Sequence, residues 1–382
     1  MRSENLAAEI RVSNKDPAYF PFLDVLRGLA ASWVVMFHLI YITTPNMAPP
    51  RLLDRLMKSG GMGVTLFFVV SAFSLCLSSE RNKNDRVWVF YLRRFFRIAP
   101  LFYAALALTL FRDQSVFGVK HDYAQIVSSL FFIFNFVNGW QEGIVWASWT
   151  IGIEMVFYVL FPYIWKVNLT PPAVIFRVAS LCCASIVAYS VINAFPSGGQ
   201  FWQWSFFKHL PSFLIGILVY EAWKRLSRQP ETDANKYTGS AIFSCGLLLG
   251  IALLYSDQPF PLLAGLYWQG IICALLVLGA GLGAAHKFFS SPMLCRIGRN
   301  SYSIYLLHPL VIVVLQPVYK KIADVIHSPS TSFLISAAIT LFAIYLLAEL
   351  SWRFVERPGL NMGAKIIRNL RSLFGQSQIK FD

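Results

Sequence analysis

The sequence is poor in charge and contains no long polar segment. Of its 382 residues, only 14% are Asp, Glu, Lys or Arg, whereas an average soluble domain has about 25%. Hydrophobic residues make up 56% of the chain and aromatic residues 16%. One soluble core cannot bury so much apolar sequence, and a disordered chain does not carry so many aromatic residues. The composition therefore predicts a polytopic membrane protein.

The signatures of several common enzyme classes are also missing. The sequence has no GxSxG elbow, no P-loop and no HExxH pair, so a serine hydrolase, a P-loop nucleotidase or a zinc protease receives no support. Its six cysteines form no CxxC pair, and most of them lie inside apolar runs. We therefore expect neither a disulfide framework nor a bound metal.

The charge that is present is mostly positive, with 33 Lys and Arg against 19 Asp and Glu and a net charge of +14. The basic residues lie in short gaps between apolar runs and do not gather in a separate domain. This distribution is typical of the cytoplasmic loops of membrane proteins and not of a nucleic-acid-binding domain. We expect a lipid bilayer, and no nucleic acid, as a partner.

Apolar runs of near-spanning length follow one another along the chain, without the ten-residue alternation of a membrane barrel. The eleven runs occupy 22–44, 62–79, 98–111, 124–137, 147–165, 172–194, 203–223, 238–255, 259–285, 301–319 and 331–352. The pattern predicts an all-α fold. The first 20 residues are polar and unlike a cleavable signal peptide, so the first run is expected to act as its own insertion signal.

Lys and Arg also predict the orientation of the chain. The segments 80–97 and 224–237 and the C-terminal tail are rich in them and are expected in the cytoplasm. The loops without Lys or Arg, expected outside, are 138–146, 195–202 and 256–258. Both termini then face the cytoplasm, and we expect the protein in the plasma membrane, the inner membrane of a bacterium.

This orientation requires an odd number of crossings between residues 97 and 138. The two apolar runs there have 14 residues each, which is short for a span of about 20. We predict that 98–111 crosses and that 124–137 is a short re-entrant or interfacial helix. The total is about ten transmembrane helices. The predicted organisation is a cytoplasmic N-terminal tail at 1–20, a membrane domain at 21–358 and a basic cytoplasmic C-terminal tail at 359–382.

Ionisable residues inside apolar runs are costly and therefore mark candidate functional sites. In the first run, Arg27 and His38 are eleven residues apart, so on a helix they share one face about 16 Å apart along the axis. Asp24 precedes Arg27 by three residues and can pair with it. The alternative is structural: a buried His that bonds a neighbouring helix and an Arg that extends to the membrane surface.

Glu154 lies in the fifth run at a depth that matches that of His38, when each is counted from the end of its own helix. A carboxylate there could orient His38 while the imidazole acts as a base. Tyr158 is four residues further on, on the same helix face as Glu154. A structural Glu–His or Glu–Arg pair is the alternative.

Three further groups are candidates for binding. Arg94 and Arg97 are three residues apart at the cytoplasmic end of the third run, where two guanidinium groups suit a phosphorylated ligand. Ser301, Tyr305 and His308 share one helix face; His308 could contact a cofactor or satisfy a neighbouring polar group. Lys208 and His209 lie near the outer side, where they could meet a polar acceptor or simply reach the interface. The alternative for Arg94 and Arg97 is topology, because arginines gather at the cytoplasmic ends of transmembrane helices in any case.

These segments together resemble the integral-membrane acyltransferase family 3. The matching segments, in family order, are LDVLRGLAASWVVMFH, FFVVSAFSL, FYLRRFFRIAP, SWTIGIEMVFYVLFP, LPSFLIGILVY, IGRNSYSIYLLHPL and FVERP. They run from about residue 20 to residue 360. One departure is Ser71-Ala72-Phe73, where the family usually has Ser-Gly-Phe. Some relatives carry a fused SGNH domain, and this chain is expected to lack it.

The resemblance implies transfer of an acyl group, often acetyl, from cytoplasmic acyl-CoA to a hydroxyl of a cell-surface or lipid-linked carbohydrate. It implies that His38 is the essential histidine, with Arg27 as its partner on the same helix, and that Arg94 and Arg97 bind the donor. With Glu154, proposed above from its depth, the expected catalytic residues are His38, Glu154 and Arg27. The expected donor-binding residues are Arg94, Arg97, Tyr302 and His308. The expected acceptor-binding residues are Trp149, Tyr158, Lys208 and His209.

His38 could serve as a general base or carry the acyl group itself, and the sequence does not separate the two. Acyl-CoA is the expected co-substrate, and glycan-assembly proteins are candidate partners. A proton-coupled transporter or flippase of a glycan or lipid is the alternative function, because intramembrane His, Glu and Arg also suit proton coupling. Such a protein would often show two related halves, and the first-helix motif occurs only once.

Overall fold

The computed structural model of the chain describes residues 19–43, 47–166, 169–194, 204–228, 233–256 and 265–373. Every regular element within these ranges is a helix, which confirms the predicted all-α fold. The predicted outer loop at 195–202 lies outside the described residues, as do 257–258, residues 1–18 of the N-terminal tail and the last nine residues of the chain.

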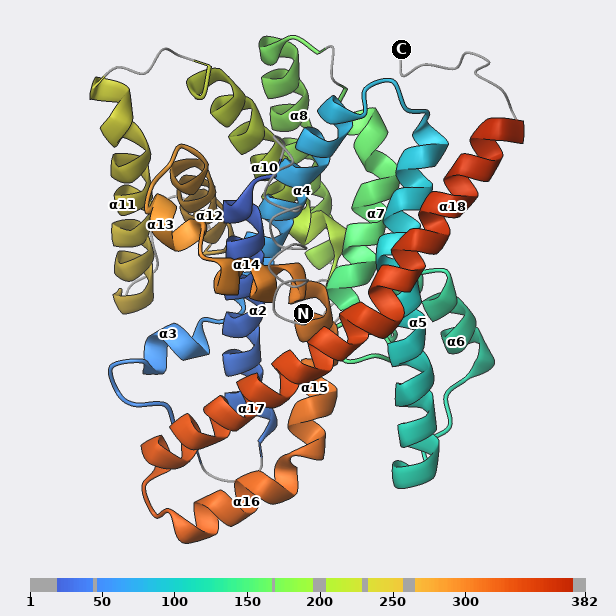
Figure 1. Cartoon of the computed structure of the whole chain (residues 1–382), viewed down its shortest axis with the longest axis vertical. Coiled ribbons are helices and arrows are strands. Elements are labelled where there is room, and N and C mark those ends of the chain that lie inside the picture. The colour runs from blue at the N-terminus through green and yellow to red at the C-terminus, as the bar shows by residue number, and fades with distance from the viewer. Residues whose placement is uncertain are drawn as a thin grey trace, which may run out of the picture.

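Long apolar helices dominate the molecule (Figure 1) and confirm a polytopic membrane protein. Within the ranges that the structure describes, six helices are long and apolar enough to span: α2 (Pro21–Ile42), α4 (Met62–Arg81), α5 (Val87–Phe117), α8 (Pro171–Asn193), α11 (Asp233–Tyr255) and the continuous stretch from α17 (Pro329–Ser351) through η3 (Trp352–Glu356) to α18 (Arg357–Leu373). Two shorter apolar helices are α7 (Trp149–Ile164) and α12 (Gly265–Gly281). The sequence predicted about ten spans.

The other described elements are shorter or less apolar. They are α3 (Asp54–Lys58), α6 (Tyr123–Leu130), η1 (Phe134–Phe136), α10 (Phe206–Leu226), α13 (His286–Phe289), α14 (Pro292–Arg299), α15 (Ser301–Val314) and α16 (Gln316–Val325). The segment 124–137, predicted not to cross, forms α6 and η1. Eight helical residues rise about 12 Å, too little to span a membrane.

The run at 301–319, predicted as one span, is divided between α15 and α16. The two helices pass as one span only when taken together, because they meet at an angle of 58°. Pro317 lies at the start of α16, where its missing N–H and its ring break the α-helical hydrogen bonding. The Gln316 side chain donates from Nε2 to the carbonyl oxygen of Ile42 at 2.9 Å, which ties the bend to the end of α2.

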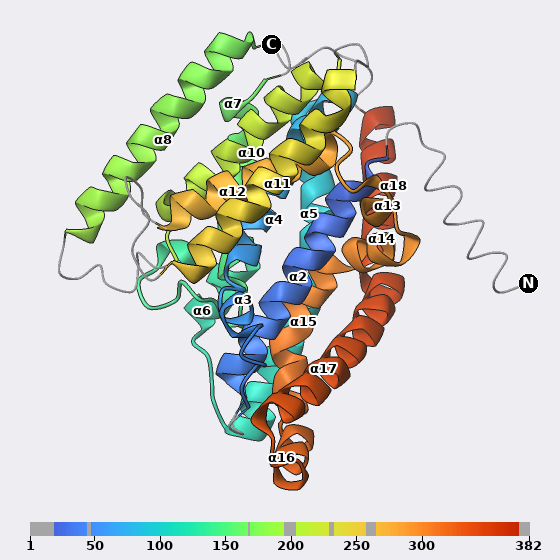
Figure 2. The same ribbon diagram turned by 90° about the vertical axis from the view of Figure 1, so that its left-hand side faces the viewer.

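Helix α2 lies in the middle of the bundle, with α8 and α11 towards the outside (Figures 1 and 2). Glycine allows its close contact with α14, since a Cβ on Gly298 would come within 1.9 Å of the carbonyl oxygen of Asp24. A Cβ on Gly63 of α4 would come within 2.6 Å of the carbonyl oxygen of Ala30. These contacts bring the helices that carry the candidate residues close together.

Ala72, where the family usually has glycine, also lies at a close contact between two helices. Ala72 is fully buried, and a Cβ added to Gly216 of α10 would lie 2.8 Å from the Ala72 methyl carbon. The extra methyl group therefore faces a glycine on the neighbouring helix.

Most of the segment predicted as a C-terminal tail is the helix α18, which packs against α5 (Figure 1). Its Gly359 lies against Pro100 and its Gly363 against the Phe96 ring, with the latter Cβ position 2.7 Å from Phe96 Cβ. The Arg371 guanidinium donates to the Asp85 carboxylate at the other end of the contact. Residues 357–373 thus form part of the folded body.

Candidate active site

A cavity of about 350 Å³ lies between the central helices and is lined by four arginines. This volume falls in the range of small-molecule sites. The arginines are Arg27 of α2, Arg94 and Arg97 of α5, and Arg299 of α14. Two carboxylates, those of Asp24 and Glu154, share the lining. The remaining polar lining comes from Ser71, Thr150, Tyr158, Ser301, Tyr302 and Tyr305.

Arg27 is held at the cavity wall by its own helix and by α4. Its Nη1 lies 3.5 Å from Asp24 Oδ1, which confirms the predicted pair. Its Nη2 donates to Ser74 Oγ at 2.8 Å. The Tyr19 hydroxyl donates to Asp24 Oδ2 at 2.8 Å, and burial, followed by the Asp24 carboxylate, raises the pKa of that hydroxyl above its usual value. Tyr19 therefore stays protonated and remains a donor.

Two of the cavity arginines keep buried donors that no described group satisfies. The Nε atoms of Arg94 and Arg299 are both buried without a hydrogen-bond partner among the described residues. Arg94 lies over the rings of Phe90 and Tyr158 at 5.8 and 5.9 Å. An unsatisfied buried donor costs free energy, so these guanidinium groups are suited to an anionic ligand with several oxygen atoms.

Arg299 was not among the residues predicted from the sequence, although it stands in the quoted IGRN segment. Its guanidinium lies over the Trp352 ring at 5.6 Å. The sequence could have indicated Arg299 by its spacing of three residues from Arg296, at the end of a short amphipathic segment. Position in a helix does not reveal which arginine faces a cavity, and Arg296 instead pairs with Glu349 at 2.9 Å.

Glu154 belongs to the arginine cavity and forms no hydrogen bond with His38. Its Oε1 accepts from Ser71 Oγ at 2.6 Å and from the Tyr158 hydroxyl. The predicted pairing matched depths along two helices, but depth does not fix the rotation of each helix about its axis. That rotation turns Glu154 towards α4 and the arginines.

His38 instead contacts His308, a residue 270 positions away (Figure 1 shows their helices α2 and α15). His308 Nε2 lies 2.9 Å from His38 Nδ1, and His38 Nδ1 lies 3.0 Å from the carbonyl oxygen of Val34. The other nitrogen of His308, Nδ1, contacts the carbonyl oxygen of Tyr305. His308 is fully buried and, like His38, does not line the arginine cavity.

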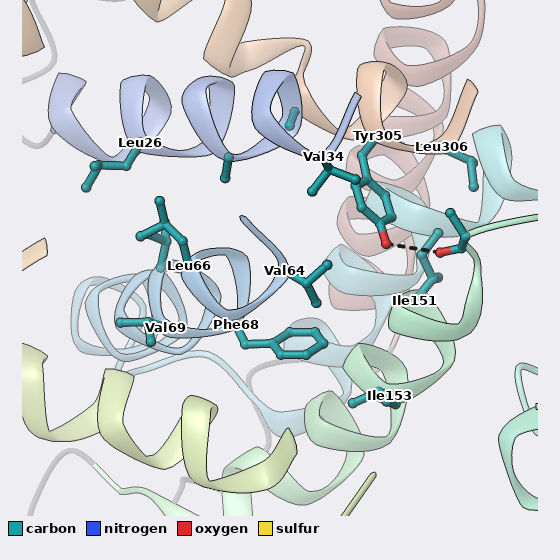
Figure 3. Close-up of a cluster of buried hydrophobic side chains, with 14 of the residues drawn as sticks. Leu26, Val34, Val64, Leu66, Phe68, Val69, Ile151, Ile153, Tyr305 and Leu306 are labelled. Atoms are coloured by element: carbon teal, nitrogen blue, oxygen red, sulfur yellow. Dashed lines mark hydrogen bonds between the residues drawn. The ribbon is translucent and has the colours of Figure 1, made fainter. Parts of the chain in front are cut away.

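Tyr305 stands between the arginine cavity and the two histidines. It lines the cavity, and its ring centroid is 5.7 Å from that of His308. Its hydroxyl accepts from Thr150 Oγ1 at 2.9 Å and donates to the carbonyl oxygen of Ala147 at 3.2 Å. Figure 3 shows this ring among apolar side chains that include Val34, with its hydroxyl directed at the start of α7.

The residues predicted to bind the acceptor do not gather at one place. Trp149 and His209 are neighbours, with ring centroids 5.1 Å apart, and Trp149 also lies 4.6 Å from Trp204. Lys208 precedes His209 in α10. Tyr158, by contrast, lines the arginine cavity.

Aromatic residues that the sequence analysis did not select surround His38. The Phe37 ring lies 5.2 Å from the imidazole and the Trp146 ring 6.5 Å from it. Tyr41, whose ring centroid lies 4.7 Å from that of Phe37 at an interplanar angle of 48°, is 61% exposed, and Trp146 is 44% exposed. His38 is thus approached by exposed aromatic surface that is not part of the cavity lining.

No group of His, Cys, Asp or Glu that could hold a metal occurs within the described ranges. All six cysteines are described, and each is free.

Residues 20–349 match the family model of an acyltransferase domain, acyltransferase family 3. The chain belongs to this family. The match confirms the resemblance read from the motifs and covers every candidate residue named above.

Curated relatives carry related names. A protein named "Putative O-acetyltransferase SAR0937", from Staphylococcus aureus strain MRSA252, is 25% identical over 94% of this chain and 60% of its own length. O-acetyltransferase OatA, from Staphylococcus aureus strain NCTC 8325, is 23% identical over 94% of this chain and 60% of its own length. The chain therefore spans about three fifths of these relatives. No solved structure shows a significant match.

Proposed function

We propose that this protein is a membrane O-acyltransferase that moves an acyl group, acetyl by preference, from cytoplasmic acyl-CoA to a hydroxyl of a cell-surface or lipid-linked carbohydrate. The observation that carries the proposal is the arginine-lined cavity, which reaches Tyr305 and so comes within one side chain of the His38–His308 pair. A site for a polyanionic donor thus adjoins a candidate base. The names of the relatives support acetyl as the transferred group.

The donor is proposed to bind in the arginine cavity. Four guanidinium groups against two carboxylates leave the lining positive, and the planar guanidinium matches phosphate oxygens two at a time. Arg94 and Arg97 were proposed from the sequence, and Arg27 and Arg299 join them. Since the N-terminal end of α5 follows the basic segment 80–86, the cavity is proposed to open towards the cytoplasm, with both chain termini on that side.

Tyr302 and Tyr158 are proposed to shape the donor site. Tyr302 lines the cavity, and its hydroxyl donates to the carbonyl oxygen of Ile98 at 2.8 Å, which joins α15 to α5. Tyr158 and Ser71 hold the Glu154 carboxylate at the wall. Glu154 then orients the donor site next to Arg94 and does not act on His38.

Catalysis is proposed to take place at His38. As the acceptor oxygen bonds to the thioester carbonyl carbon, the hydroxyl proton passes to His38 Nε2. The carbon–sulfur bond then breaks, and the coenzyme A sulfur leaves as a thiolate and takes that proton. A positioned base of this kind contributes about 10²–10⁴-fold. Transfer through an acyl-histidine would use the same nitrogen.

The acceptor is proposed to approach from the aromatic side of His38. Trp146 offers an exposed ring beside the imidazole, and aromatic rings stack on the C–H faces of sugars. Trp149, Lys208 and His209 lie further along, on α7 and α10, and are proposed to contact the rest of a long glycan. Proteins that assemble the glycan are the partners this location would serve.

The test uses acetyl-CoA and inside-out membrane vesicles from the native host, which contain the natural acceptor whatever its identity. Release of free coenzyme A thiol and incorporation of labelled acetyl into glycan are measured for the wild type, His38→Ala and Arg94→Gln. We expect His38→Ala to abolish both signals and Arg94→Gln to raise the KM for acetyl-CoA. Wild-type transfer by correctly inserted His38→Ala would refute the proposed chemistry, and acceptor flux without thiol release would favour a flippase.

A further inference from the structure

We infer that His308 is a positioning residue that fixes the protonation pattern of His38, so that His38 Nε2 carries the lone pair that accepts the acceptor's proton. The inference rests on the proposed function, in which His38 is the base. It assigns His308 to the histidine pair, whereas the sequence had suggested contact with the donor.

The proton arrangement follows from the groups that surround the two rings. A backbone carbonyl oxygen can only accept, so the contact between His308 Nδ1 and the Tyr305 carbonyl requires a proton on Nδ1. A neutral imidazole carries one proton, which leaves His308 Nε2 as an acceptor.

The contacts of His38 fix the position of its proton in the same way. Its Nδ1 faces two acceptors, His308 Nε2 at 2.9 Å and the Val34 carbonyl oxygen at 3.0 Å. A proton on His38 Nδ1 can be shared between these two acceptors, whereas a lone pair there would oppose both of them. In the neutral ring, Nε2 must therefore hold the lone pair.

The opposite arrangement is penalised at the backbone contacts. A lone pair on His38 Nδ1 would oppose the lone pairs of the Val34 carbonyl. His308 would then either turn a lone pair towards the Tyr305 carbonyl or carry two protons inside an environment that buries it completely. The structure thus specifies one tautomer of each histidine by backbone groups that cannot change their own protonation.

His308 also has a role during turnover. When His38 Nε2 takes the acceptor proton, the ring becomes a cation whose Nδ1–H still donates to His308 Nε2. The neutral His308 therefore stabilises that cation and keeps the ring in its orientation, as a carboxylate does for the histidine of a serine protease triad. Glu154, bonded to Ser71 and Tyr158, is not available for this task.

The test compares two substitutions of His308 in the vesicle assay with acetyl-CoA. In His308→Gln, the amide can donate to the Tyr305 carbonyl and present an oxygen to His38 Nδ1–H. In His308→Leu, the shape is roughly kept but the acceptor is lost. His327→Gln, an exposed histidine beyond α16, is the matched control, and His38→Ala reports on the proposed function separately.

We expect His308→Leu to lower the maximal rate at least about tenfold, a part of the ~10²–10⁴-fold that a positioned base supplies, with the KM for acetyl-CoA within about twofold of the wild type. His308→Gln should recover most of the rate, and His327→Gln should match the wild type. A raised KM at an unchanged maximal rate would overturn the inference and make His308 a donor-binding residue. Equal loss in the Gln and Leu variants, or no loss in either, would also overturn it, and His38→Ala would still decide the proposed function.

Discussion

Removing Arg299 tests the arginine cavity at the residue that only the structure identified. In Arg299→Gln the side chain keeps much of its length and loses its charge, while its neighbour α2 is left in place. A hydrogen bond to a charged group contributes about 1.5–3 kcal/mol. Because about 1.4 kcal/mol corresponds to a factor of ten in affinity, we expect the KM for acetyl-CoA to rise by roughly 10- to 150-fold.

The assay is thiol release from acetyl-CoA by protein in vesicles, measured over a range of acetyl-CoA concentrations. Arg368→Gln, an exposed cation on α18, removes the same charge outside the cavity and should leave the KM unchanged. The double variant with Arg94→Gln should lose more affinity than either single variant, because both Nε donors face the same ligand space. A wild-type KM in Arg299→Gln, with normal membrane insertion, would show that the cavity does not bind the donor phosphates.

Three other substitutions test separate parts of the proposal. Gly298→Val should lower both the melting temperature and the activity, because its Cβ would overlap the Asp24 carbonyl; Gly61→Ala, where the added Cβ meets nothing within 4 Å, is the control, and equal melting temperatures would contradict this packing. Trp146→Ala should reduce labelling of glycan at limiting acceptor without changing the KM for acetyl-CoA, and a change in that KM alone would remove Trp146 from the acceptor side. Glu154→Gln should change the KM for acetyl-CoA more than the maximal rate. A larger change in the maximal rate would instead indicate that Glu154 acts on His38.

The sequence predicted the fold class and named several residues that the structure brings together at the cavity, although it gave them different roles. Helical runs and buried charges can be found along one dimension, so Arg27, Arg94, Arg97 and Glu154 were identified without coordinates. The Asp24–Arg27 pair was also predictable, because a spacing of three residues on one helix fixes proximity.

The contacts between helices were not predictable in the same way. The pairing of His38 with His308, in place of Glu154, depends on how α2, α7 and α15 are rotated about their axes, and a single sequence does not encode that rotation in its periodicity. The docking of α18 on α5 also escaped prediction, since a basic amphipathic segment after the last apolar run has the composition of a tail.

If the donor occupies the arginine cavity as proposed, the ring of Tyr305 stands between its thioester and the acceptor side of His38. The thioester arm must then pass this ring to reach His38, which limits hydrolysis of a bound donor while no acceptor is present.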